Sequence, residues 1–208
     1  MATTYTDTNG VVYTYTVPGS GTTSTASISG YTGSGTTVTP LASFVVGAVT
    51  YSVTSTAVNA FLSKTLITTV TLPTSVTSIG ATTFSGCSNL TLVVIPSSVT
   101  TIGNSAFLNC SKLDNVTIPS SVTTIGTNIF QSCIGLTSIT IPSSLTNISN
   151  GMFRLCSGLT RFTKTLLPML ITEFGIVKLV SPLHNLNMPL LILVNEDGIV
   201  ILVSPMQL

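Results

Sequence analysis

A motif of 23 residues recurs through the middle of the chain and restricts the folds open to it. Five residue types keep the same step. Their columns are Pro73, Pro96, Pro119 and Pro142; Ile79, Ile102, Ile125 and Ile148; Phe84, Phe107, Phe130 and Phe153; Cys87, Cys110, Cys133 and Cys156; and Leu90, Leu113, Leu136 and Leu159. Val53, Phe61 and Ile67 are in phase in a weaker copy before them. A period of about 20 to 50 residues is the signature of a solenoid, in which each unit buries its apolar face against its neighbours.

Each unit predicts one strand followed by a return path. Leu136, Ile139 and Ile141 have the spacing of a leucine-rich-repeat strand, whose last two apolar side chains point to one face. The next residue, a proline, ends the strand because it has no N–H for the ladder. On the return path we expect Gly103 to allow a tight bend and residues 104–107 to form a short helical turn. Stacked units would then place equivalent side chains about 4.8 Å apart.

These units resemble a known family of repeats. Leu136–Ile148, and Val122–Phe130 with Cys133 after it, are similar to the BspA-like leucine-rich repeats of surface proteins from bacteria and protists, which large DNA viruses also encode. The resemblance covers about Val45 to Arg161. It implies binding or adhesion rather than catalysis. It also implies that residues 11–15 and 47–53 are strands leading into the array.

The expected fold class is an α/β repeat solenoid. It is a right-handed leucine-rich-repeat superhelix of about four to five coils, with a parallel β-sheet on one face and short helical turns on the other. We expect residues 1–46 to form a β-rich N-terminal cap, within which residues 19–40 form hairpin loops. Residues 47–163 would be the repeats, and residues 164–208 an atypical apolar tail.

The small number of charged residues excludes several function classes. Six Lys or Arg and five Asp or Glu make up 5% of 208 residues, while the sequence has a single His. This leaves little material for acid/base or metal chemistry, so we expect neither an enzyme nor a cofactor. With a net charge of +1 and no basic cluster, nucleic acid is not an expected partner. No run of about 20 apolar residues predicts a membrane span, and the first ten residues do not read as a signal peptide.

The four repeat cysteines are interpreted as core residues. Their 23-residue spacing puts them in one buried column, where a free thiol acts as a small hydrophobe. Zinc sites instead favour close pairs of cysteines, and disulfides between neighbouring coils would distort the column. The cysteines therefore do not identify the compartment of the protein.

The outward positions of the predicted strands form the candidate binding face. Hydroxyl side chains dominate it, and it offers a surface to a protein, a glycan or ice, although Thr also simply suits exposed strand positions. The candidate residues are Thr91, Val94, Asp114, Asn115, Thr117, Thr137, Ser138, Thr140, Thr160, Arg161 and Thr163.

The tail loses the repeat but not its period, since residues 173–182 resemble residues 196–205. The reverse complement of the repeat codons, read one base out of frame, turns Pro into Gly, Gly into Pro, Cys into His or Gln, and Phe into Asn or Lys. All 32 positions from Val177 to Leu208 have codons compatible with partners from Thr163 back to Ser132. We infer that residues from about 164 onward translate an inverted copy of the repeat DNA, which the gene's nucleotide sequence would test.

This origin changes how tail residues are interpreted. His184 pairs with Cys156 in the inverted copy and has no acid of independent origin, so we do not expect it to be a catalytic base. Leu190–Val194 and Ile199–Val203 predict a hairpin. We expect this segment to be poorly ordered, to cap the last coil, or to mediate self-association as an uncharged β segment.

The function predicted from the sequence is non-catalytic recognition or adhesion. The family resemblance favours the cell surface or the extracellular space. Two alternatives stay open: a structural component of a large virus particle or other assembly, and a truncated gene product that has lost its function. The ligand, the organism and the oligomeric state do not follow from the sequence.

Overall fold

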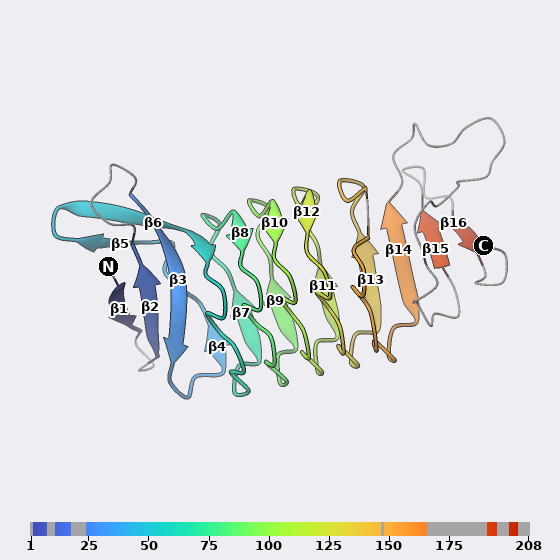
Figure 1. The fold of residues 1–208 in the computed structure, drawn as a ribbon, viewed down its shortest axis with the longest axis horizontal. Coiled ribbons are helices and arrows are strands. Elements are labelled where there is room, and N and C mark those ends of the chain that lie inside the picture. The colour runs from blue at the N-terminus through green and yellow to red at the C-terminus, as the bar shows by residue number, and fades with distance from the viewer. Residues whose placement is uncertain are drawn as a thin grey trace.

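The computed structural model describes residues 2–7, 11–17, 24–146, 148–165, 191–194 and 200–203. The chain winds into coils that follow one another along the long axis of the molecule (Figure 1). Two eight-stranded sheets run along this axis. Sheet A contains β1 (Ala2–Thr6), β2 (Val12–Thr16), β3 (Thr25–Thr32), β6 (Val49–Thr56), β8 (Ser78–Ile79), β10 (Thr101–Ile102) and β12 (Thr124–Ile125) in spatial order, with β5 (Ser43–Val46) paired to β6.

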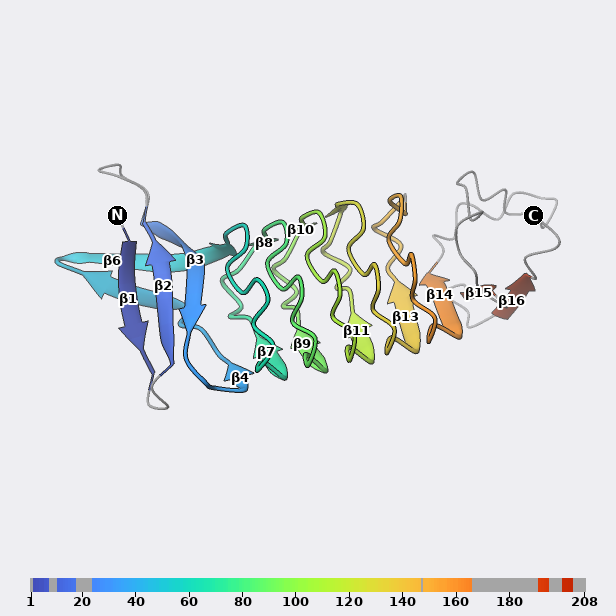
Figure 2. The same ribbon diagram turned by 60° about the horizontal axis from the view of Figure 1, so that its bottom comes forward.

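Sheet B forms the opposite side of each coil (Figure 2). Its strands in spatial order are β4 (Thr37–Val38), β7 (Thr69–Thr71), β9 (Leu92–Val94), β11 (Asn115–Thr117), β13 (Ser138–Ile141), β14 (Arg161–Thr165), β15 (Leu191–Val194) and β16 (Val200–Val203). From β4 to β15 neighbouring strands are parallel.

The strand registers reproduce the sequence period. Asn115 lies beside Ser138, and Ser138 beside Arg161, so each step along sheet B advances the chain by 23 residues. Sheet A keeps the same step, with Thr101 between Ser78 and Thr124. The predicted stacking of identical positions is therefore confirmed.

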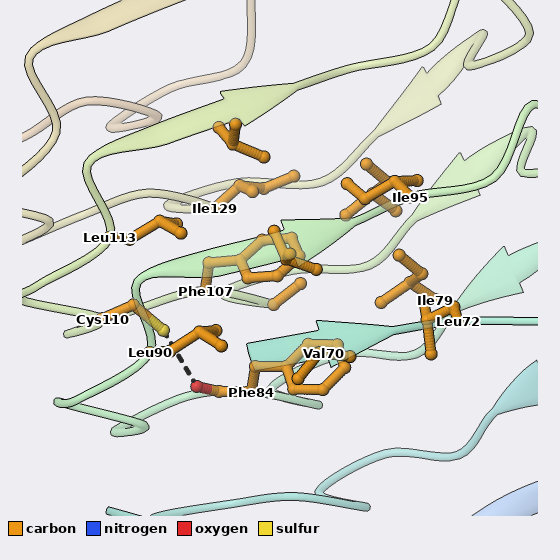
Figure 3. Close-up of a cluster of buried hydrophobic side chains, with 14 of the residues drawn as sticks. Val70, Leu72, Ile79, Phe84, Leu90, Ile95, Phe107, Cys110, Leu113 and Ile129 are labelled. Atoms are coloured by element: carbon orange, nitrogen blue, oxygen red, sulfur yellow. Dashed lines mark hydrogen bonds between the residues drawn. The ribbon is translucent and has the colours of Figure 1, made fainter. Parts of the chain in front are cut away.

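A column of phenylalanine rings fills the centre of the coils (Figure 3). Phe84, Phe107 and Phe130 are fully buried, and successive rings are stacked with centroids 5.4 Å apart and planes 11° from parallel. The column continues to Phe61 and Phe153, again with stacked rings. Phe162 ends it with an edge contact to Phe153 at 5.6 Å and 85°. Such offset stacking adds to the free energy of burying each ring.

The expected helical turns are not confirmed, because no helix occurs among the described residues. Residues 104–107 form turns in which Ser105 has a φ of 54°, and Asn109 follows with a φ of 60°. The residues equivalent to Ser105 and Asn109 also have a positive φ in every coil from Asn59 to Leu155. Two left-handed residues per coil prevent a right-handed helix from forming there. The array is thus an all-β solenoid of strands and turns rather than an α/β one.

Backbone bonds between coils replace the bonds that a helix would make within itself. The N–H groups of Ser105, Phe107 and Asn109 donate to carbonyls of the next coil at 2.9 to 3.0 Å. Gly103 is explained by the same close stacking, since a Cβ there would lie 2.5 Å from the backbone nitrogen of Ala81. Gly103 therefore allows the preceding coil to approach closely, whereas the sequence had suggested a tight bend.

The N-terminal region is built from antiparallel as well as parallel pairs. The strands expected within residues 11–15 and 47–53 are present as β2 and β6. Residues 19–40 are not only loops: β3 lies between β2, to which it is antiparallel, and β6, to which it is parallel. β4 joins sheet B beside β7, so this region contributes strands to both sheets.

The predicted tail hairpin is present in the two described segments beyond residue 165. β15 and β16 pair antiparallel, with Ile192 beside Leu202, and β15 also pairs parallel to β14. The tail thus extends sheet B past the last repeat strand. His184 and the rest of the tail lie outside the described residues, and its origin from an inverted DNA copy stays a prediction.

Candidate binding face

The sheet-B face, meaning the outward side chains of β7 to β14 and the residue before each strand, brings the predicted site residues together. Thr117, Thr140 and Thr163 are in register on adjacent strands, as are Asn115, Ser138 and Arg161. Val94, one period before Thr117, extends the row of Thr117, Thr140 and Thr163, and it lies beside Thr71 of β7. The remaining predicted residues, Thr91, Asp114, Thr137 and Thr160, occupy one column just before β9, β11, β13 and β14.

Alternation along each strand explains this placement. Val116 and Ile139 point into the core and are 2% exposed, so their neighbours on both sides must point outward. None of the eleven predicted residues is buried. They lie on adjacent strands of one sheet, and such an extended surface suits contact with a large partner better than enclosure of a small molecule.

Several hydroxyls on this face are already hydrogen-bond donors within the protein. The Thr91 hydroxyl donates to the carbonyl of Thr68 at 3.0 Å, and that of Thr160 to the carbonyl of Thr137 at 3.3 Å. The Thr137 hydroxyl donates to Asp114 Oδ1 at 2.9 Å. A ligand would therefore meet these three hydroxyls as hydrogen-bond acceptors rather than as free donors.

Sequence reasoning missed the apolar centre of the face. Leu92 is 48% exposed and shares β9 with Val94, which is 44% exposed. Leu92 lies beside Thr69 on one side and Asn115 on the other. The signal was available, since Leu92 precedes Asn115 by one period of 23 residues. Thr69 and Thr71 extend the face by the same rule.

The cysteine column offers no reactive group. The Sγ of Cys110 donates to the carbonyl of Phe84 in the preceding coil at 3.1 Å, as Figure 3 shows, and Cys87, Cys133 and Cys156 make the equivalent bond. Burial raises the pKa of the Cys87 thiol to about 11 and raises that of Cys110 as well, so both stay protonated at neutral pH. The column is a hydrogen-bonded part of the core, a role that the sequence indicated only as apolar.

No group of three or more His, Cys, Asp or Glu that could hold a metal occurs in the part of the chain that the structure describes. The same residues contain no helix long and apolar enough to cross a membrane. The side chains of the sheet-B face are mainly hydroxyls around the exposed apolar pair Leu92 and Val94.

Comparison with known proteins agrees with this architecture. The sequence profile of the BspA type leucine rich repeat region matches residues 52–173 in six copies, which corrects the expected four to five. A leucine-rich repeat protein from Bacteroides ovatus is 28% identical with a TM-score of 0.67, over 75% of this chain and 40% of that one. A leucine rich cell surface protein from Faecalibacterium prausnitzii is 31% identical with a TM-score of 0.67, over 79% of this chain and 45% of that one.

A T. pallidum leucine rich repeat protein, 24% identical with a TM-score of 0.57, shares the fold over 83% of this chain and 90% of that one. The chain spans less than half the length of the Bacteroides and Faecalibacterium proteins. No curated protein matches the chain.

Proposed function

Because the chain belongs to the BspA-type leucine-rich repeat family, we propose that it is a non-catalytic recognition module that binds a protein through its sheet-B face. The observation that carries this proposal is the exposed pair Leu92 and Val94 within a face that is otherwise rich in hydroxyls. Sheet faces of repeat proteins form extended surfaces suited to binding.

The arrangement of this face favours a protein over a glycan. Protein interfaces combine an apolar centre with a polar rim, and charged residues are depleted at that centre. Leu92 and Val94 supply such a centre, while Thr69, Thr71 and Asn115 adjoin it in register. The charged members of the predicted site are Asp114, just before β11, and Arg161, in β14, which are one and three strands away from β9. The apolar pair would form the core of the contact and the hydroxyls its rim.

We place this module at the cell surface. The Faecalibacterium relative is described as a cell surface protein, and the family resemblance indicated the same location. Protease treatment of intact cells that produce the chain tests this location. Cleavage without lysis is expected, and protection until lysis would contradict it.

The binding test compares face variants with a matched variant on another side of the coil. Immobilised chain is screened against arrays of purified cell-surface and extracellular-matrix proteins and, in parallel, of glycans. We expect a protein ligand whose Kd rises about tenfold or more for Val94→Lys and Thr117→Lys, because each places a charge in a desolvated contact. Val58→Lys changes a valine that is 60% exposed in a turn segment, and it should bind like the unmodified chain.

Equal affinity of the face variants and the unmodified chain would place the contact elsewhere. Binding to glycans alone would overturn the choice of a protein ligand. A structural role, the main alternative, would instead show the chain copurifying with particles while tolerating Thr117→Lys.

A further inference from the structure

In the described part of the chain, β1 forms the outer edge of sheet A at its N-terminal end. β1 pairs with β2 on one side, and no other strand pairs with it among the described residues. Edge strands usually carry a charge, a proline or a bulge that prevents pairing with another chain. β1 has the sequence Ala-Thr-Thr-Tyr-Thr, with none of these protections.

The backbone direction of β1 shows which groups face this edge. The Asp7 N–H donates to the Val11 carbonyl at 2.8 Å, so Asp7 points its amide toward β2. Because the direction alternates along an antiparallel strand, Ala2, Thr4 and Thr6 point their N–H and C=O groups away from β2. Thr4 stands in the middle of this outward set.

A core-facing aromatic ring is left partly uncovered at the same edge. Tyr5 lies beside Tyr13, and Thr3 beside Tyr15, so Tyr5 is on the face of the sheet that carries these tyrosines. Tyr13 and Tyr15 are fully buried, yet Tyr5 is 39% exposed. The buried face therefore ends at β1 with a ring that lacks a neighbour on its outer side.

The β5–β6 hairpin reaches beyond this edge. At the base of the hairpin, the ring of Phe44 packs against that of Tyr15, with ring centroids 4.7 Å apart. The tip of the hairpin extends along the long axis past β1 (Figures 1 and 2). Gly47 forms the turn with a φ of 62°. Val45 and Val49, two residues before and two residues after Gly47, are 64% and 44% exposed. An apolar arm thus projects past an open strand edge.

We propose that two copies of this chain associate as a twofold dimer, with their β1 strands paired antiparallel about Thr4. Pairing about Thr4 sets Thr4 opposite Thr4, Thr3 opposite Tyr5, and Ala2 opposite Thr6 of the second copy. Thr–Thr and aromatic–β-branched pairs are favourable across antiparallel strands. The same register joins the outward N–H and C=O groups of both strands, and it overlaps all five residues of β1.

A second copy fits this edge for reasons of charge and size. No residue from Ala2 to Thr6 is charged, and the net charge of +1 gives two copies little mutual repulsion. A stable interface buries about 800 Å² on each partner, more than a five-residue strand edge supplies alone. The arms supply the rest, since each hairpin tip would cover Tyr5 of the other copy. Such a dimer presents two sheet-B faces, which raises avidity for a clustered ligand.

The test measures the molar mass of the full chain by light scattering across a concentration series. The unmodified chain should reach twice 21.5 kDa. Thr4→Pro should shift it to 21.5 kDa at the same concentrations, because proline removes the central N–H at the edge while the β1–β2 bonds remain. Unchanged circular dichroism verifies that the variant is folded.

Two further measurements test the register and the arm. Thr4→Lys and Thr4→Glu should each be less dimeric alone but form a mixed dimer when combined, since residue 4 meets residue 4. Val45→Asp should weaken the dimer, whereas Val58→Asp, at a valine of similar exposure, should not. A chain that stays at 21.5 kDa, a dimer that persists in Thr4→Pro, or a failure of the Lys and Glu variants to combine would each overturn the proposal.

Discussion

The repeat array and the N-terminal region bury aromatic rings in different ways. In the array, the rings from Phe61 to Phe153 are stacked, with interplanar angles between 5° and 13°. In the N-terminal region, Tyr13 meets Tyr15 at 36° and Tyr31 at 68°. The Tyr15 hydroxyl also accepts a hydrogen bond from the Leu41 N–H at 3.0 Å.

This difference follows from how each region is generated. A constant coil length translates every side chain onto its equivalent, so rings in the array can only stack in parallel columns. The N-terminal strands have no common period, and each tyrosine meets different neighbours. The array therefore depends on repeated shape, and the N-terminal region on specific polar contacts. Burial raises the pKa of Tyr15 to about 12, which keeps its hydroxyl neutral inside this region.

The largest expected effect is the loss of a ring from the middle of the column. Phe107→Ala should lower the free energy of unfolding by about 3 to 5 kcal/mol, because it leaves a cavity against both Phe84 and Phe130. Denaturant unfolding measures the change. Phe107→Leu, which keeps most of the volume, is the matched control and should cost clearly less. Phe44→Ala, at a half-buried ring on the hairpin, should also cost less, and equal losses at Phe44 and Phe107 would break the comparison.

The next effect tests the polar contacts of the N-terminal region. Tyr15→Phe should lower the free energy of unfolding by about 1 to 3 kcal/mol, because the Leu41 N–H loses its acceptor while the ring packing is kept. Tyr51→Phe, at a half-buried ring that stacks on Phe44, serves as the control and should change stability less. Thermal unfolding of both variants gives the comparison. Equal changes would mean that the Tyr15 hydroxyl contributes nothing specific.

The smallest effect is a gain, and it tests the turn geometry of the array. Leu155 has a φ of 62°, a conformation that costs a residue with a Cβ about 1 to 2 kcal/mol, and its side chain is 62% exposed. Leu155→Gly should therefore raise stability by about 1 kcal/mol, since Gly86 occupies the equivalent position three periods earlier in the chain. Leu62→Gly, at an exposed leucine without a positive φ, should instead lower stability by about 0.5 to 1 kcal/mol. A loss of stability in Leu155→Gly would contradict the idea that the positive φ of Leu155 costs free energy.

Much of the candidate face was predictable because it lies inside the repeat. Thr117, Thr140 and Thr163 could be aligned by counting residues, and the register of β11, β13 and β14 agrees with that alignment. Leu92 could have been found by the same count. Its exposure of 48% could not, because an apolar residue in a strand is equally compatible with burial.

The turn segments show where local patterns were insufficient. Asn-Ser-Ala-Phe is compatible with a helical turn, but the next coil lies close enough to accept hydrogen bonds from alternate residues. Those bonds between coils hold Ser105 and Asn109 in left-handed conformations. A contact between residues 22 or more positions apart thus decided a local conformation, and no window of a few residues contains that information.

By itself, the sequence determined the coil length, the buried columns and the hydroxyl-rich character of the outward strand positions, because equivalent residues at a constant period must occupy equivalent places in a stack. Only the tertiary structure decided that β3 pairs with β6, that β4 belongs to sheet B and that β1 ends sheet A. These strands have no repeat to define their partners. Their pairing depends on long-range packing of dissimilar segments, which the order of residues along the chain does not express.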